Sequence, residues 1–226
     1  MFGTAIRTAA GYVTMPLWER SKSLREWIAR RRDKRRLQRL VKRQQFPEQI
    51  RTILVVCKGN ICRSPLAEAY LRSGLARCGQ DVSVLSAGLE TSLGKPAHNL
   101  AQLVGRTAGI LLDTHATKPL LKEHVEQADL IVAMEHAHYY RLQRLYPHCQ
   151  EKTFLLRQFS DAHGKHDEEV EIADPYSGTL NDFQECFAII TRSCDQLIRE
   201  ICKVNANACG TPRRSGQDGM ARTARD

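Results

Sequence analysis

The sequence lacks several features that would place it outside the ordinary globular proteins. None of its apolar runs reaches the 18 residues that a transmembrane helix needs, and residues 1–7 lack the apolar block of a secretory signal. Eight cysteines among 226 residues are too few for a disulfide framework. No Cys-x2-Cys or paired histidine accompanies Cys186, Cys194, Cys202 and Cys209 in the sequence, so these cysteines do not predict a zinc site. We therefore expect a cytoplasmic chain with free thiols, no metal and no cofactor.

Charge divides the chain into three parts. The net charge of +9 combines +10 over residues 1–51, −4 over residues 52–202 and +3 over residues 203–226. We predict a basic, partly helical extension (residues 1–50), one domain (residues 51–202) and a flexible C-terminal tail (residues 203–226) in which Asn, Gly, Pro, Arg and Ser dominate. No internal repeat is present.

The basic extension contains a stretch without Gly or Pro, residues 17–45, which predicts a helix. Its positive charges surround the helix near residues 30–36, so that no clean apolar stripe continues there. This pattern fits a solvated helix, or a basic helix on an anionic membrane or an acidic protein surface, with the protein peripheral at the membrane. Nucleic acid is disfavoured as a partner, because aromatic stacking residues are scarce in this segment.

Strand and helix signals alternate along the central domain. Apolar, β-branched runs predict strands at residues 52–56, 82–85, 130–133 and 152–156. Between and after them, helices are predicted at residues 65–77, 99–108, 119–127, 136–145 and 182–201. This order predicts the α/β class: a single, doubly wound, four-stranded parallel sheet with helices on both faces. Such sheets bind ligands at the carboxyl ends of their strands.

A phosphate-binding loop is predicted where the first strand meets the first helix. Cys57 ends the strand, five residues follow, and Arg63-Ser64-Pro65 opens the helix. Loop N–H groups and a helix N-terminus form a cradle for an anion, and the same field favours the thiolate form of Cys57. The planar fork of Arg63 can hold two phosphoryl oxygens.

The residues inside this loop fit the same chemistry. Gly59 and Asn60 tolerate the left-handed backbone that a tight loop needs. The hydroxyl of Ser64 is placed to donate to the sulfur of Cys57. A thiolate that attacks a phosphate monoester needs an acid to protonate the leaving oxygen. Asp174 is the best candidate, because it lies in a loop next to Pro175, with Tyr176 beside it to line an aromatic pocket.

The segment from Val55 to Pro65 resembles the loop of the low-molecular-weight protein tyrosine phosphatase family at nearly every position. The resemblance spans about residues 51–202, and its further segments are Ala67-Glu68, Ser86-Ala87-Gly88, Gly109-Ile110 with His115, residues 128–131 with Met134-Glu135, and Asp174-Pro175-Tyr176. Gly94-Lys95-Pro96-Ala97 resembles the bacterial branch, which often opposes tyrosine autokinases of exopolysaccharide export.

The resemblance implies a phosphotyrosine phosphatase with a phosphocysteine intermediate. In this family, Cys57 would be the nucleophile, Arg63 the phosphate ligand and Asp174 the general acid and base. Substrate-binding positions would be Lys58, Gly59, Asn60, Ile61, Cys62, Ser64 and Tyr176. His115 would support the loop by hydrogen bonding, and Cys62 would protect Cys57 through a reversible disulfide, unless it is only a packed thiol.

Three further features of the sequence invite separate predictions. Lys58 stands where an uncharged residue is more usual, which predicts a preference for acidic residues beside the phosphotyrosine. Asp167, Glu168, Glu169 and Glu171 form a run that is usually solvated, but to which the basic extension could dock. Cys186, Cys194 and Cys202 recur every eight residues, which favours core packing.

Two other functions remain as alternatives at this point. An arsenate reductase on the same fold would also use a thiol in an anion loop, but residues 110–148 lack the further cysteine pair that such enzymes usually need. A non-catalytic phosphopeptide-binding module would not require Cys57, Arg63 and Asp174 together.

Overall fold

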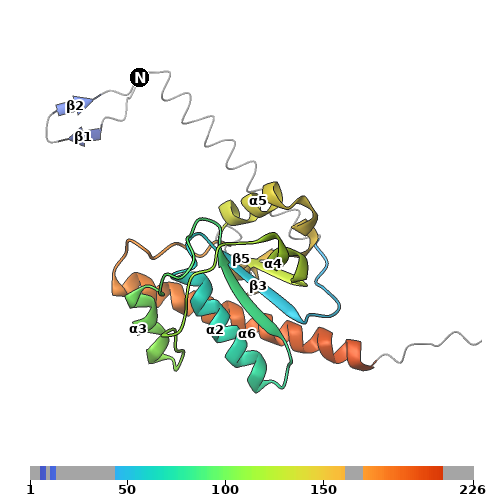
Figure 1. Ribbon diagram of the computed structural model, residues 1–226. Coiled ribbons are helices and arrows are strands. Elements are labelled where there is room, and N and C mark those ends of the chain that lie inside the picture. The colour runs from blue at the N-terminus through green and yellow to red at the C-terminus, as the bar shows by residue number, and fades with distance from the viewer. Residues whose placement is uncertain (1–5, 9–10, 14–43, 161–169, 211–226) are drawn as a thin grey trace, which may run out of the picture. The chain divides into compact units, whose positions relative to one another are not determined.

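The computed structural model describes residues 6–8, 11–13, 44–160 and 170–210 (Figure 1). The chain divides into two units, Met1–Gln45 and Phe46–Asp226. In the first unit, β1 (Ile6–Thr8) pairs antiparallel with β2 (Gly11–Val13), a hairpin that the sequence did not lead us to expect. The helix predicted over residues 17–45 falls almost entirely outside the described residues, as do Asp167, Glu168 and Glu169.

The second unit is built on a four-stranded sheet in which every pair of neighbours is parallel. Its strands, in spatial order, are β4 (Ser83–Gly88), β3 (Thr52–Cys57), β5 (Leu130–Ala133) and β6 (Thr153–Leu155). The predicted fold class is therefore confirmed. Of these four strands, β3 comes first along the chain but lies inside the sheet, so its carboxyl end opens between two neighbours, which is where ligands bind in this architecture.

Helices cover both faces of the sheet (Figure 1). One face carries α2 (Arg63–Arg77) and α6 (Leu180–Gly210), with α3 (Asn99–Thr107) packed against both. The other face carries α4 (Lys122–Gln127) and α5 (His136–Leu145). Two short 3-10 helices, η1 (Pro147–Lys152) and η2 (Leu156–Phe159), flank β6. No helix in these described ranges is long and apolar enough to cross a lipid bilayer.

The strands alternate sides as the pleat of a sheet requires. In β3, Ile53, Val55 and Cys57 join the core beneath α2 and α6, whereas Leu54 and Val56 are buried on the opposite face. Because both faces are covered, the strand is apolar throughout instead of alternating with polar residues. This burial fixes the register of β3, and it places Cys57 at the edge where the loop begins.

Several element boundaries differ from the sequence predictions, and three of the differences bear on the site or on the packing. Helix α2 begins at Arg63 instead of Pro65, so Pro65 is the third residue of its first turn. Residues 119–121 are not helical, because Pro119 bridges to Gly88 at the end of β4. Helix α6 continues to Gly210, so residues 203–210 are helical and not part of a flexible tail.

Contacts hold the segment before β3 against α6 and against the segment around β6. Asn205 in α6 accepts a hydrogen bond from the backbone N–H of Ile50 at 2.9 Å and donates one to its carbonyl at 3.0 Å. Phe46 packs edge-on against Phe154 and Phe159, with ring centroids 5.7 Å apart in each pair. The packed unit therefore starts before residue 51, where the sequence placed the boundary.

Candidate active site

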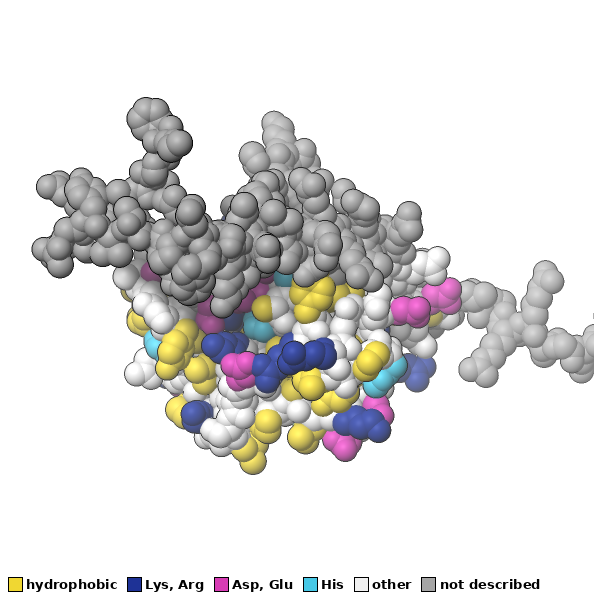
Figure 2. Space-filling view, turned by 90° about the horizontal axis from the view of Figure 1, so that it is seen from above, with side chains coloured by type: hydrophobic (Ala, Val, Ile, Leu, Met, Phe, Trp, Pro, Cys, Tyr) yellow, Lys and Arg dark blue, Asp and Glu magenta, His cyan; other side chains and the backbone are white. Residues whose placement is uncertain are grey.

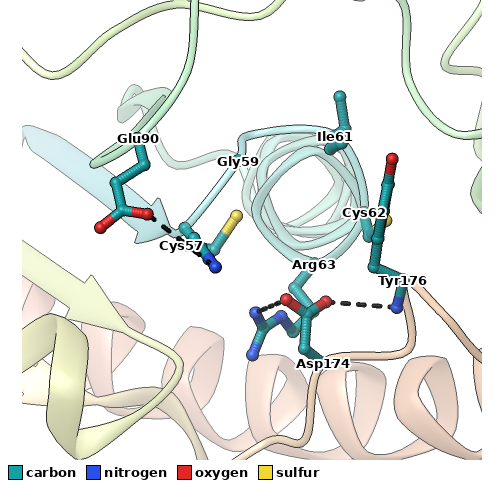
Figure 3. Close-up of a pocket in the computed structure, with 9 residues that line it drawn as sticks. Cys57, Gly59, Ile61, Cys62, Arg63, Glu90, Asp174 and Tyr176 are labelled. Atoms are coloured by element: carbon teal, nitrogen blue, oxygen red, sulfur yellow. Dashed lines mark hydrogen bonds and ion pairs between the residues drawn. The ribbon is translucent and has the colours of Figure 1, made fainter.

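The loop between β3 and α2 surrounds a pocket of ≈ 200 Å³ at the carboxyl edge of the sheet (Figure 3). Figure 3 shows Arg63 and Asp174 side by side across this pocket from Gly59. The lining residues are Cys57, Lys58, Gly59, Ile61, Cys62, Arg63, Glu90, Asp174 and Tyr176. The structure thus brings together most of the predicted site residues, from segments more than 100 residues apart.

The sulfur of Cys57 lies at the closed end of the loop. The side chain is 2% exposed, and the backbone N–H of Asn60 points at Sγ over 3.2 Å. The hydroxyl of Ser64 lies 3.0 Å from the same sulfur. An N–H and an O–H directed at one sulfur are the partners that a thiolate requires, and the helix N-terminus beyond them adds positive potential.

Asn60 holds the loop in its curved shape. Its φ of +54° lies in the left-handed region, which Asn adopts more readily than most residues. The buried amide donates to Ser64 Oγ at 2.9 Å and to Ser86 Oγ at 2.8 Å, and its oxygen accepts from the N–H of Lys118 at 2.9 Å. Gly88 permits this packing, because a Cβ there would lie 3.1 Å from the Asn60 nitrogen. One side chain therefore links the loop to β4 and to the segment before α4.

The hydrogen-bond directions in this network follow from its ends. Both amide protons of Asn60 are donated, so Ser64 and Ser86 accept, and their own protons point elsewhere. Ser86 donates to the carboxylate of Glu68, which is also paired with Arg72. Ser64 is left to donate to the sulfur of Cys57. The network thus directs a proton toward the sulfur.

His115 contacts the loop from outside. Its Nε2 lies 2.8 Å from the carbonyl oxygen of Asn60. Burial lowers the pKa of His115, so the ring is neutral near pH 7 and donates its single Nε2 proton to this carbonyl. This is the contact that the support role expected for His115 requires.

Arg63 is held from behind, which leaves part of its guanidinium facing the loop. The side chain is 1% exposed; Nη1 donates to the carbonyl of Ile172 at 2.9 Å and pairs with Glu135. Burial alone would lower the pKa of Arg63, but the hydrogen bond to Glu135 and the nearby negative charges outweigh burial and raise it. Within the described chain its Nε has no hydrogen-bond partner. A phosphoryl oxygen would supply one, because buried donors require partners.

Asp174 approaches the same guanidinium from the loop before α6. Its Oδ2 lies 2.7 Å from Arg63 Nη2, and its side chain is 38% exposed. Its Oδ1 accepts from the N–H of Tyr176 at 3.3 Å, a turn that Pro175 stiffens. The carboxyl group is therefore close to the bound phosphoryl position and still open to water.

The second cysteine of the loop is also buried. Cys62 is 3% exposed, and burial, together with the charges of Asp174 and Cys57, raises its pKa to about 12. It is therefore a thiol, not a thiolate, at neutral pH. Cys57 and Cys62 are both free thiols in the structure.

The mouth of the pocket carries both signs of charge. Lys58 is 3.9 Å from Glu90, and Glu90 also pairs with Arg141 of α5. In Figure 2, basic side chains lie beside acidic ones on the described surface seen from above, instead of forming a surface of one sign. At the mouth, Lys58 and Arg141 thus share the carboxylate of Glu90.

Sequence reasoning missed several residues that support the pocket. Glu135 holds Arg63, Glu90 faces Lys58, and His98 stacks on Phe183 at 4.9 Å while its edge meets Tyr176 at 5.7 Å. Glu135 was part of a recognised segment, but its partner lies 72 residues away. No local pattern signals such a contact. Only the meeting of two parallel strand ends could have suggested it.

A parallel sheet, a Cys-x5-Arg loop after its first strand and an acid beside the arginine define a thiol-dependent phosphatase. Comparison with known proteins gives the family. The model of the low molecular weight phosphotyrosine protein phosphatases matches residues 52–207. The chain belongs to this family, and it is a phosphoric monoester hydrolase.

Individual relatives agree with this assignment. The chain is 38% identical over 152 residues to a probable low molecular weight protein-tyrosine-phosphatase, EpsP, of Ralstonia nicotianae, which covers 67% of this chain and 97% of the relative. Etp of Escherichia coli K12 is 34% identical over the same share of this chain and 95% of its own. The tyrosine phosphatase AmsI of Erwinia amylovora superposes with a TM-score of 0.62 at 29% identity, over 70% and 97% of the two chains.

One solved neighbour is named for a different substrate. The arginine phosphatase YwlE from Geobacillus stearothermophilus gives a TM-score of 0.62 at 30% identity, over 70% of this chain and 96% of the neighbour. The comparisons thus favour a phosphatase over an arsenate reductase or a binding module.

Proposed function

We propose that the chain removes phosphate from protein phosphotyrosine through a phosphocysteine intermediate, with Cys57 as nucleophile, Arg63 as phosphate ligand and Asp174 as general acid. The observation that carries this proposal is the convergence of these three side chains on one pocket. It is supported by the 2.7 Å contact between Arg63 and Asp174, which puts the acid next to the group that would hold the phosphate.

In the first step, the thiolate of Cys57 attacks phosphorus, and the phenolic oxygen leaves. Backbone N–H groups of the loop and the Nε and Nη2 of Arg63 bind the phosphoryl oxygens as charge moves onto them. Protonated Asp174 gives its proton to the leaving oxygen. An S–P bond forms, an O–P bond breaks, and the products are a phosphocysteine and a free tyrosine side chain.

In the second step, the carboxylate of Asp174 takes a proton from water, and this water attacks the phosphocysteine. The sulfur leaves as a thiolate, which the hydroxyl of Ser64 and the N–H of Asn60 stabilise. Inorganic phosphate is released, and Asp174 is again protonated for the next cycle.

The walls of the pocket support an aromatic ester. Cys57 is 2% exposed, so the phosphoryl group must reach the closed end of the loop, and a short Ser or Thr side chain would not extend that far. Ile61 and the half-exposed ring of Tyr176 offer apolar surface to a phenyl ring. The guanidinium of phosphoarginine would gain no hydrogen-bond acceptor from Ile61.

The partners are proposed on weaker grounds. Lys58 and Arg141 at the mouth support a preference for acidic residues beside the phosphotyrosine, and a tyrosine autokinase is the candidate substrate because of the segment Gly94-Lys95-Pro96-Ala97. The basic extension is proposed to bind an anionic membrane or an acidic protein surface on the cytoplasmic side.

The test compares phosphotyrosine, phosphoserine and phosphoarginine peptides of one sequence. We expect kcat/KM to be highest for phosphotyrosine and Cys57→Ser to abolish phosphate release. Higher kcat/KM for phosphoarginine would overturn the substrate assignment. A second peptide pair, with Asp or with Lys on both sides of the phosphotyrosine, tests the preference attributed to Lys58; equal KM values would contradict it.

A chain starting at Gln44 tests the basic extension without removing Phe46 from the core. We expect the full chain to sediment with vesicles that contain anionic lipid and the shortened chain to stay in solution, with equal turnover of a small aryl phosphate. Equal sedimentation of both chains would contradict the membrane role.

A further inference from the structure

Helices α2 and α6 pack with a constant sequence offset. Tyr70 donates to Asp195 at 2.8 Å, and a Cβ built on Gly74 would lie 2.4 Å from Cδ1 of Ile198. Farther along, Gln80 accepts from Asn205 at 3.1 Å. Each of these pairs is separated by 124 or 125 positions, so the two helices run in the same direction along their contact.

Cys78 and Cys202 occupy the next position of this register. They are 124 residues apart and stand one helical turn beyond Gly74 and Ile198. Cys78 ends α2 and is exposed, whereas Cys202 is half-buried against the core. Burial raises the pKa of Cys202, and a hydrogen bond to the Cys78 thiol raises it further. The register of the two helices thus places the two thiols side by side.

We propose that Cys78 and Cys202 form a reversible disulfide when the protein meets a peroxide, at a redox site separate from the phosphate-binding loop. The proposal does not depend on the catalytic roles given above. Helix α2 has 15 residues, which places Cys78 about 20 Å from Arg63 at the other end. The disulfide would therefore change the stability of the fold and not the chemistry at Cys57.

The reaction needs one equivalent of hydrogen peroxide. Exposed Cys78 attacks an oxygen of the peroxide as a thiolate and becomes a sulfenic acid, while the other oxygen leaves as hydroxide. The sulfur of Cys202 then attacks the sulfenyl sulfur, an S–S bond forms, and the hydroxyl group leaves as water once protonated. In sum, two thiols and one peroxide give one disulfide and two waters. A dithiol such as dithiothreitol reverses the reaction by exchange.

The position of this bond suggests what it does. It would join the end of α2 to the last turns of α6, one turn before Asn205, which holds Ile50 at the start of β3. The bond would close a loop of more than 100 residues, and long loops gain most from a crosslink in the chain-entropy account. Oxidation would therefore lock the C-terminal helix onto the domain.

Peptide mapping tests the proposal directly. The full chain is treated with a small excess of hydrogen peroxide, alkylated with iodoacetamide, and digested with trypsin without reductant. The sequence predicts a species in which peptide 78–106 is linked to peptide 200–203, and dithiothreitol should remove it. We expect the oxidised chain to melt about 5 °C or more above the reduced chain.

Three variants make the test specific. Cys78→Ser and Cys202→Ser should each abolish the linked peptide and the rise in Tm, whereas Cys62→Ser, which removes any disulfide within the loop, should retain both. Cys78→Ser should hydrolyse an aryl phosphate at the wild-type rate under reducing conditions. The proposal is overturned if oxidised Cys78 ends as a sulfinic acid or as a Cys78–Cys78 link between two chains while Cys202 remains open to alkylation.

Discussion

The amide of Asn60 donates to the hydroxyl of Ser64 at 2.9 Å, and this contact fixes the direction of the next hydrogen bond. Because the Ser64 oxygen already accepts a proton, its own proton points to the sulfur of Cys57, 3.0 Å away. In the proposed mechanism, this hydroxyl donates to the sulfur when the phosphocysteine breaks down and the sulfur leaves.

Ser64→Ala should therefore slow the breakdown of the phosphocysteine more than its formation. We expect kcat to fall about 10- to 100-fold, with a burst of phenol release that the wild type does not show at the same enzyme concentration. Rapid-quench kinetics with p-nitrophenyl phosphate measure both quantities. Equal loss in kcat and kcat/KM, with no burst, would mean that Ser64 acts on the first step instead.

Asp174→Asn, assayed with different leaving groups, should show that Asp174 protonates the leaving oxygen. The variant keeps the shape of the loop but cannot give up a proton, so kcat/KM should fall about 10²–10⁴-fold for phosphotyrosine. For aryl phosphates with more acidic phenols the loss should shrink, because these leave without protonation. A loss that is independent of the phenol would show that Asp174 positions Arg63 through their 2.7 Å contact and does not donate a proton.

Glu135 should affect the binding of phosphate and vanadate by holding Arg63 in place. Glu135→Ala removes the anchor on Nη1 and leaves only the carbonyl of Ile172 behind the guanidinium. We expect inhibition by inorganic phosphate or vanadate to weaken about tenfold, and Glu135→Gln, which can still accept a hydrogen bond, to weaken it less. Unchanged inhibition constants for Glu135→Ala, in a variant with wild-type Tm, would contradict this role.

The sequence predicted those parts of the fold that depend on local pattern. The runs that became β3, β5 and α5 were bounded to within a residue, because burial on both faces or a helical period leaves a clear trace. The end of α6 was not predicted, because a tertiary contact and not a local pattern determines it. Asn205 has a low intrinsic helix propensity. Here its side-chain amide is hydrogen-bonded to the backbone of Ile50, and this tertiary contact outweighs the low propensity.

The residues of the site also divide into those that local sequence predicts and those that it does not. The residues from Cys57 to Ser64 could be predicted, since phosphate chemistry places them next to one another in the chain. Glu135 and Glu90 could not, since each meets its partner only after strands distant in sequence align. His98 could not be predicted either, because only the folded chain brings its ring next to the rings of Tyr176 and Phe183.

His98 should set the position of the Tyr176 ring. His98→Ala removes the ring that lies between Tyr176 and Phe183, so Tyr176 loses its support at the pocket wall. We expect KM for phosphotyrosine peptides to rise about three- to tenfold with little change in kcat, because ring contacts of this kind contribute about 0.5–1.5 kcal/mol. Tyr176→Phe keeps the ring and serves as the matched control. A fall in kcat at constant KM would contradict a binding role.

His138 should make the fold sensitive to acid. It is 5% exposed on α5, and its Nδ1 has no hydrogen-bond partner in the described chain. Burial lowers the pKa of His138 to about 4; the negative charge of Glu135 opposes this shift, and the positive charge of Arg63 adds to it. In the unfolded chain the pKa has the ordinary value near 6.5. Between these two pH values the unfolded state binds the proton and the folded state does not. Above pH 6.5 the titration of His138 therefore does not reduce the free energy of unfolding. As the pH falls from 6.5 toward 4, the free energy of unfolding decreases.

Urea unfolding at pH 7.5 and pH 5 measures this effect. At pH 5 the solution is about 1.5 pH units below the pKa of His138 in the unfolded chain. The free energy of unfolding of the wild type should therefore fall about 2 kcal/mol more than that of His138→Gln, which carries no titrating ring. His148→Gln, at an exposed position, should follow the wild type. If His138→Gln loses as much stability as the wild type over this range, the acid sensitivity originates elsewhere, and the buried ring must find a partner when it is protonated.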